Sequence, residues 1–189
     1  MRILIDTREQ RPFSFTRFPG VAIERAALPA GDYSLPGFED RVAIERKELN
    51  DLIACLKGDN RDRFERELTR ARHYELFAVV VEASLEDVSK GRYRSEMKPH
   101  AALQSIFAFQ VRYRVPFVWA GGREAAEYAT YSLLEKYRTE IEKRFEQLNR
   151  ERKTEHGIET ETRAICRGIP NRLERDPGRD SRRLLAETS

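Results

Sequence analysis

Cysteine and histidine are scarce in this chain, and their scarcity excludes several kinds of site. The 189 residues include two cysteines and three histidines. Cys55 and Cys166 are too few and too far apart for a disulfide framework or a zinc site. The histidines, His73, His100 and His156, show no metal-ligand spacing. These absences argue against a zinc hydrolase and against a nuclease that uses a histidine base.

Long apolar runs are also absent, and acidic and basic residues nearly balance. No run approaches a membrane span, and Arg2 leads into a short strand pattern without the apolar core of a signal peptide. We therefore expect a cytoplasmic protein, at the nucleoid or in a eukaryotic nucleus, that is not secreted and has no membrane partner. The net charge of +3 comes from 35 basic and 32 acidic residues, so a nucleic-acid partner must contact local positive patches.

Short apolar segments that alternate with amphipathic ones predict a single α/β domain. Strands are expected at residues 3–5, 21–28, 33–35, 42–45, 76–81 and 116–120, and helices at 50–56, 61–73, 99–113 and after Gly122. Residues 76–81 are apolar throughout, which predicts a central strand covered on both faces. Residues 154–189 contain no Phe, Trp or Tyr. We expect a domain over 1–153 and a polar C-terminal tail over 154–189, mobile or used for docking.

The segment after Gly31 places two carboxylates and a lysine close together. Val42 and Ile44 alternate with Arg41, Ala43 and Glu45, and this period of two indicates a short strand. Glu45 and Lys47 then lie on one face of that strand, and Arg46 lies on the other. Gly31 lets the chain bend sharply, and residues 33–35 can form an adjacent strand. The resulting hairpin would bring Asp32 beside Glu45.

Paired carboxylates and a lysine are what a metal-dependent nuclease needs. Two close carboxylates repel each other unless a cation lies between them, and Mg²⁺ prefers one or two carboxylates together with water and phosphate oxygens. Lys47 could hold the attacking hydroxide and offset charge in the transition state. An isolated Glu-x-Lys pattern is also typical of an ordinary charged solvent face, so the interpretation depends on the wider context.

In that context the chain resembles the nuclease domains of the XPF type, a branch of the restriction-endonuclease-like PD-(D/E)XK enzymes. The family signature is GD, then ERK, then three residues and D, which here is residues 31–32, 45–47 and 51. A second family element, an apolar strand that ends in Asp-x-Arg-Glu, matches residues 3–9. A glycine and an arginine at the entry of a helix match Gly58 and Arg61. The resemblance covers roughly residues 1–150.

The resemblance implies a central mixed β-sheet flanked by helices, and it assigns the metal site. Asp32 and Glu45 would bind Mg²⁺ or Mn²⁺, with the backbone carbonyl of Arg46 as a third protein ligand. Lys47 would be the catalytic lysine. Asp6 matches the further acidic residue that the family places near the metal, although a carboxylate at the end of a strand can equally cap a turn.

Four further residues are assigned to the surroundings of that site. Arg8 and Glu9 border it, and Arg8 and Arg61 are expected to contact DNA. Glu9 and Asp51 are expected to shape the site, and Asp51 also suits the first turn of a helix, where the dipole favours a carboxylate. The other arginines near Arg61 alternate with acids, as on an ordinary solvated helix face.

The predicted function is that of a Mg²⁺- or Mn²⁺-dependent endodeoxyribonuclease, a hydrolase that cuts flapped, forked or branched DNA in repair or recombination. The opposed hypothesis is a non-catalytic DNA-binding or dimerisation module with the same fold. The resemblance also implies a homodimer or heterodimer formed through the nuclease domain, and a helicase or another DNA-binding protein as partner. The expected interface lies on the helix at 99–113 or on the long last helix.

Overall fold

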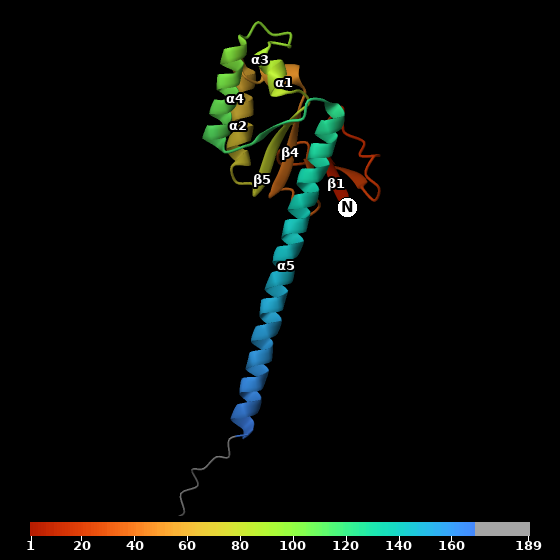
Figure 1. Cartoon of the computed structure of the whole chain (residues 1–189), viewed down its shortest axis with the longest axis vertical. Coiled ribbons are helices and arrows are strands. Elements are labelled where there is room, and N and C mark those ends of the chain that lie inside the picture. The colour runs from red at the N-terminus through yellow and green to blue at the C-terminus, as the bar shows by residue number, and fades with distance from the viewer. Residues whose placement is uncertain (169–189) are drawn as a thin grey trace, which may run out of the picture. The chain divides into compact units, whose positions relative to one another are not determined.

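The computed structural model describes the backbone of residues 1–168 and the side chains of residues 1–152 (Figure 1). The chain divides into two compact units, Met1–Glu142 and Lys143–Ser189. The first unit holds all strands of the described chain and four whole helices. The fifth helix begins in the first unit and continues into the second. No helix of the described chain is long and apolar enough to cross a membrane.

A six-stranded mixed sheet forms the centre of the first unit, with strand order β2-β1-β3-β4-β5-β6. Its strands are β1 Arg2–Asp6, β2 Ala22–Ala26, β3 Tyr33–Ser34, β4 Val42–Lys47, β5 Leu76–Val81 and β6 Phe117–Trp119. β3 pairs antiparallel with both β1 and β4, and the other pairs are parallel. β1 and β4 therefore run in the same direction, and their carboxyl ends lie at the same edge of the sheet.

Helices flank this sheet, as the predicted α/β class requires. They are α1 Leu49–Ala54, α2 Gly58–Ala71, α3 Leu85–Ser89, α4 Pro99–Tyr113 and α5 Arg123–Gly168. Pro99 occupies the first turn of α4, where its missing N–H costs no hydrogen bond. Each expected strand and helix of the first unit is present, and most ends differ from the prediction by one to three residues.

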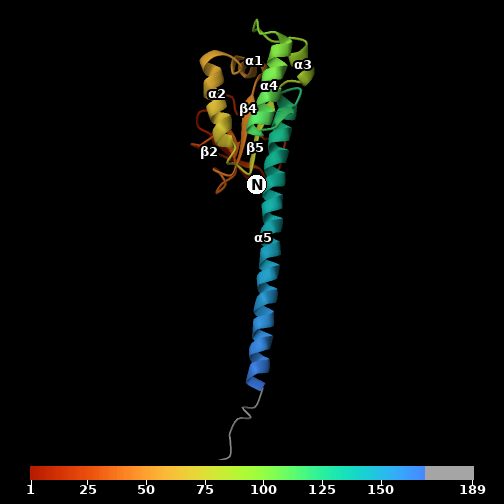
Figure 2. The same ribbon diagram turned by 90° about the vertical axis from the view of Figure 1, so that its left-hand side faces the viewer.

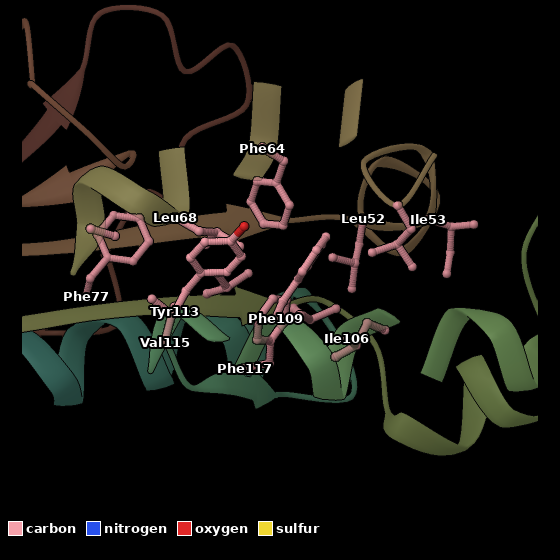
Figure 3. Close-up of a cluster of buried hydrophobic side chains, with 14 of the residues drawn as sticks. Leu52, Ile53, Phe64, Leu68, Phe77, Ile106, Phe109, Tyr113, Val115 and Phe117 are labelled. Atoms are coloured by element: carbon pink, nitrogen blue, oxygen red, sulfur yellow. The ribbon is translucent and has the colours of Figure 1, made fainter. Parts of the chain in front are cut away.

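One face of the sheet is covered by α1, α2 and α4, which share an apolar core (Figures 1 and 2). Phe64 of α2 points toward Phe109 and Phe117, and the ring centroids lie 5.9 and 6.4 Å away (Figure 3). β5 has buried side chains on both faces: residues 77, 79 and 81 belong to this core, and residues 78 and 80 to the core on the opposite face. The prediction of a strand covered on both sides is confirmed.

The opposite face is covered by the start of α5 and by the segment that follows β1. Phe13 stacks on Tyr33 at 5.2 Å between ring centroids, and its N–H donates to the Tyr33 hydroxyl at 2.9 Å. Phe15 has a φ of 53°, and its N–H donates to the Glu127 carboxylate of α5 at 2.6 Å. These contacts anchor residues 8–15 beside the carboxyl end of β1.

The last helix extends past the predicted start of the tail. A tail was expected from residue 154, whereas α5 continues to Gly168. A helix satisfies its backbone hydrogen bonds within the segment, so its continuation does not require an apolar core of its own. The division of the chain at residue 153 stays a prediction. Glu146 and Arg150, four residues apart on α5, form an ion pair at 3.5 Å. Residues 169–189 of the expected tail lie outside the described residues.

Candidate functional site

A pocket of about 430 Å³ opens where β1 and β4 end. In sheets with parallel strands, ligands bind outside the carboxyl ends of the strands. The pocket brings together eight of the nine predicted site residues, and only Arg61 does not line it. The lining residues are Asp6, Arg8, Glu9, Gln10, Arg11, Gly31, Asp32, Glu45, Arg46, Lys47, Asp51, Cys55, Asn60, Arg63, Phe64 and Glu67.

Gly31 is required by the close approach of its backbone to β4. It has a φ of 73°, and a Cβ placed there would lie 2.9 Å from the Ala43 Cβ and 3.2 Å from the Ile44 carbonyl oxygen. Neither the left-handed conformation nor the space suits a side chain. The N–H of the next residue, Asp32, donates to the Ile44 carbonyl at 2.9 Å. The glycine of the GD pair therefore sets the distance between Asp32 and β4.

Asp32, directly before β3, lies beside Glu45 of β4, as the predicted hairpin requires. The Asp32 carboxylate accepts a hydrogen bond from the Arg46 N–H at 2.8 Å. Burial, and then the charge of Glu45, hold the pKa of Asp32 well above its usual range. Glu45 itself is 5% exposed. This pair carries more negative charge than its surroundings neutralise, so a cation would be stabilised between the two groups.

Lys47 supplies the nearest positive charge. Its ammonium donates a hydrogen bond to Glu45 and lies 5.3 Å from the centre of the Phe64 ring. Burial alone would lower the pKa of Lys47, but the adjacent Glu45 carboxylate outweighs it and the pKa is raised. The amine is therefore protonated at neutral pH. The face assignment is also confirmed, because Lys47 lies on the Phe64 side of the sheet and Arg46 on the Phe13 side.

Glu67 of α2 is a site residue that sequence reasoning missed. Its carboxyl group is within hydrogen-bonding contact of Glu45, and burial, followed by the charge of Glu45, raises the pKa of Glu67 to about 7. A signal was present in the sequence. The buried residues of α2 are Phe64, Leu68 and Ala71, and a carboxylate three residues after Phe64 falls on the flank of that apolar stripe.

Asp6 is held by hydrogen bonds from neighbouring groups. It is 1% exposed and accepts from the N–H of Arg8 at 2.7 Å, from the Arg8 guanidinium at 2.7 and 3.0 Å, and from the N–H of Leu28 at 2.8 Å. Burial would raise the pKa of Asp6, but the hydrogen bonds from Arg8 and Leu28 lower it. These contacts are those of a carboxylate that caps a turn, and a role of Asp6 at the metal stays a prediction. The Arg8 guanidinium is committed to Asp6 and to the Leu28 carbonyl at 2.9 Å.

The side chain of Arg46 is the centre of a buried ion-pair network. It is 8% exposed and lies 2.6 Å from the Glu82 carboxylate and 3.5 Å from that of Glu9. Arg123, the first residue of α5, also bonds to Glu82 at 2.9 Å. Glu9 lines the pocket and joins this network, and its role in shaping the site stays a prediction. Glu82 and Arg123 were missed by the sequence analysis. The network joins β4, the end of β5, α5 and the segment after β1, and it holds the Arg46 backbone beside Asp32.

Arg61 does not line the pocket, although the sequence analysis chose it for DNA contact. Its guanidinium donates to Glu65 at 2.8 Å and to the Leu56 carbonyl at 3.2 Å, and it stacks on Phe109 of α4 at 4.8 Å. In this structure Arg61 joins α2 to α4, and a DNA contact through it has no structural support. Asp51 lines the pocket and lies in the first turn of α1.

The donor set fits a hard divalent cation that keeps part of its water shell. Among the described residues, no group of three or more His, Cys, Asp or Glu side chains could enclose a metal ion. Asp32 and Glu45 form a pair of carboxylates that opens to solvent through the pocket. Mg²⁺ is commonly bound by one or two carboxylates, with waters and substrate phosphate oxygens completing its coordination.

The structure thus defines an α/β domain whose acidic site lies at the carboxyl ends of the strands. The comparisons identify its family. The ERCC4 domain model matches residues 5–132. The chain belongs to the ERCC4 domain family, a family of structure-specific nucleases, and the resemblance to XPF-type domains is confirmed.

Two solved structures agree with this assignment. XPF from Aeropyrum pernix matches at 23% identity with a TM-score of 0.59, over 77% of this chain and 69% of that chain. The same protein in complex with DNA matches at 24% identity with a TM-score of 0.54, over 73% of this chain and 65% of that chain. At these identities the likeness establishes the fold. No curated protein matched the chain significantly.

Proposed function

We propose that this chain is a divalent-cation-dependent endodeoxyribonuclease that cuts branched DNA. The observation that carries the proposal is the juxtaposition of Asp32 and Glu45 with the protonated Lys47 in a pocket open to solvent. The family contributes the reaction class, since its members are structure-specific nucleases. Hydrolysis adds the oxygen of water to phosphorus, breaks one P–O bond of the backbone and returns a proton to the leaving oxygen.

Each residue of the site has a separate role in this proposal. Asp32, Glu45 and the backbone carbonyl of Arg46 would hold Mg²⁺ or Mn²⁺. The bound cation would polarise the scissile phosphate and lower the pKa of a water. Lys47 donates to Glu45 in this structure. If Glu45 bound a cation, the Lys47 ammonium could donate to the attacking oxygen or to a phosphate oxygen, where it would offset developing charge.

DNA is the expected partner because of the family and because a similar fold has been solved with DNA. Branched substrates are favoured by a physical argument. A duplex that meets a single strand is easier to unstack and bend into a cleft than continuous duplex, so its deformation costs less. We therefore propose that flaps and forks are cut faster than matched linear duplex, which fits a role in repair or recombination.

The test is incubation of the full chain with flap, fork, duplex and single-stranded DNA in Mg²⁺, Mn²⁺ or a chelator. Cleavage near the branch, abolished by the chelator, is expected. Lys47→Ala should lower the single-turnover rate about a hundredfold, as the loss of one transition-state donor does. Binding without cleavage in either metal would replace the proposal with the non-catalytic module. A flap-to-duplex rate ratio at or below one would remove the structure specificity.

Dimerisation through the domain is also proposed, with a helicase or a second DNA-binding protein as another partner. The outer surface of α4 exposes Phe107 (42%) and Val111 (81%), and α5 exposes Tyr128 (62%). Light scattering on the full chain, and on residues 1–153 alone, should give the mass of a dimer at micromolar concentration. A monomer in both would refute the interface.

A further inference from the structure

The basic residues of the pocket differ in whether a carboxylate of the protein already pairs with them. Five of them line it, namely Arg8, Arg11, Arg46, Lys47 and Arg63. Three are committed inside the protein: Arg8 to Asp6, Arg46 to Glu82 and Lys47 to Glu45. These three neutralise internal carboxylates and are not free to bind an external anion without losing those partners.

Arg11 and Arg63 are the exceptions. Both are exposed, and among the residues whose side chains are described neither guanidinium has a hydrogen bond, ion pair or ring contact. They also come from different walls of the pocket. Arg11 precedes Phe13, which packs in the core on one face of the sheet, and Arg63 precedes Phe64, which packs in the core on the other face. The carboxylates of Asp32, directly before β3, and of Glu45 in β4 lie between these two walls.

We infer that Arg11 and Arg63 bind backbone phosphates on the two sides of the scissile phosphate. The floor of the pocket holds Asp32, Glu45 and Glu67, so a polyanion is repelled from it unless cations lie at the rim or in the centre. A guanidinium presents a planar set of donors that matches two phosphate oxygens and stays charged at every relevant pH. This inference rests on the proposed function, because it identifies residues that would bind the DNA substrate at the same site.

The helix α2 offers a matched control. Arg66 is exposed like Arg63, stands three residues later on the same helix and likewise has no partner among the described side chains, but it does not line the pocket. A general attraction between DNA and the positive side chains of α2 would involve both arginines equally. A specific phosphate contact in the pocket would involve Arg63 alone. The pair therefore separates the two explanations without a change in net charge between the variants.

The experiment measures binding of labelled fork DNA to the full chain in a chelator, across a series of salt concentrations. Arg63→Gln and Arg11→Gln should each weaken binding at low salt about tenfold, as the loss of a charge-assisted hydrogen bond does. Each should also reduce the slope of log affinity against log salt by about 0.9 on duplex contacts. Arg66→Gln should change neither quantity measurably, and Arg63→Lys should recover the slope. Thermal unfolding should match the wild type in all variants, because these side chains are exposed and unpaired.

The outcomes separate this inference from the nuclease proposal. Equal losses in Arg63→Gln and Arg66→Gln, wild-type affinity in both pocket variants, or a wild-type chain that does not bind DNA at low salt would each overturn the inference. If the wild type cleaves DNA and the pocket variants bind it as tightly as the wild type does, the nuclease proposal holds and the phosphate contacts are refuted. If the variants lose affinity as expected but the wild type cleaves DNA in no metal, the phosphate contacts are supported and the nuclease proposal is refuted.

Discussion

Asp6 and Asp32 make the most useful comparison in this molecule. Both aspartates line the same pocket, and Asp32 precedes β3, which pairs with the strand that Asp6 ends. Asp6 accepts hydrogen bonds from two backbone N–H groups and from the Arg8 guanidinium. Asp32 accepts one, from Arg46, and faces the charge of Glu45. The pKa of Asp6 is lowered and that of Asp32 is raised.

The difference shows what separates a structural carboxylate from one available to a cation. Burial acts in the same direction on both groups, since it raises each pKa. The hydrogen bonds that Asp6 accepts from Arg8 and Leu28 outweigh burial, whereas the bond from Arg46 to Asp32 does not. A buried carboxylate with four hydrogen bonds already has its negative charge stabilised by the protein. A carboxylate with one donor and an acidic neighbour does not, and a divalent cation is the external group that best supplies the missing charge.

The largest expected effect follows from removing the carboxylates that lack donors. Asp32→Asn and Glu45→Gln should each abolish metal-dependent cleavage, because each removes one of the two carboxylate ligands. The fold should survive, because the substitutions also remove like-charge repulsion. Cleavage assays and circular dichroism on the same preparations test this. Full activity in either variant would contradict the metal assignment.

A second effect should appear at the other aspartate, in stability. Asp6→Asn keeps the shape but loses the charge that accepts hydrogen bonds from Arg8 and Leu28. The free energy of unfolding should fall by about 2–3 kcal/mol, since charge-assisted bonds to a buried group are lost. Urea unfolding of Asp6→Asn beside Asp32→Asn measures the contrast. If Asp32→Asn were the less stable of the two, the distinction drawn between them would be wrong.

The smallest effect concerns Glu67 and pH. Because the folded protein raises the pKa of Glu67 from 4.5 to about 7, it binds this proton more tightly than the unfolded chain. The resulting stabilisation is present below pH 4.5 and is lost as the pH rises through about 7. In the metal-free protein, Glu67→Gln should reduce this loss by on the order of 1 kcal/mol. Urea unfolding at pH 5 and pH 8 measures it, and an identical pH dependence in the variant would refute the coupling to Glu45.

Sequence patterns alone predicted the local framework of the site. Alternation along β4 placed Glu45 and Lys47 on one face, and a glycine before Asp32 predicted the turn that brings it beside Glu45. These features depend on strand pleat, glycine conformation and a hairpin between nearby segments, which are local properties. The order of elements followed in the same way from apolar periodicity. The resemblance in motif order supplied the family, which the comparisons confirmed.

Other features were decided only by tertiary packing. Glu67 meets Glu45 because α2 crosses that face of the sheet, and Arg61 turns from the pocket because α4 lies beside α2. The hydrogen bonding of the Asp6 carboxylate depends on Leu28, which is 22 residues away. Periodicity along the chain indicates which face of an element is buried, but not which element covers it. The sequence therefore determined that Asp32, Glu45 and Lys47 meet at the end of β4. Packing added Glu67 to them and decided which charges are neutralised and which remain available to a ligand.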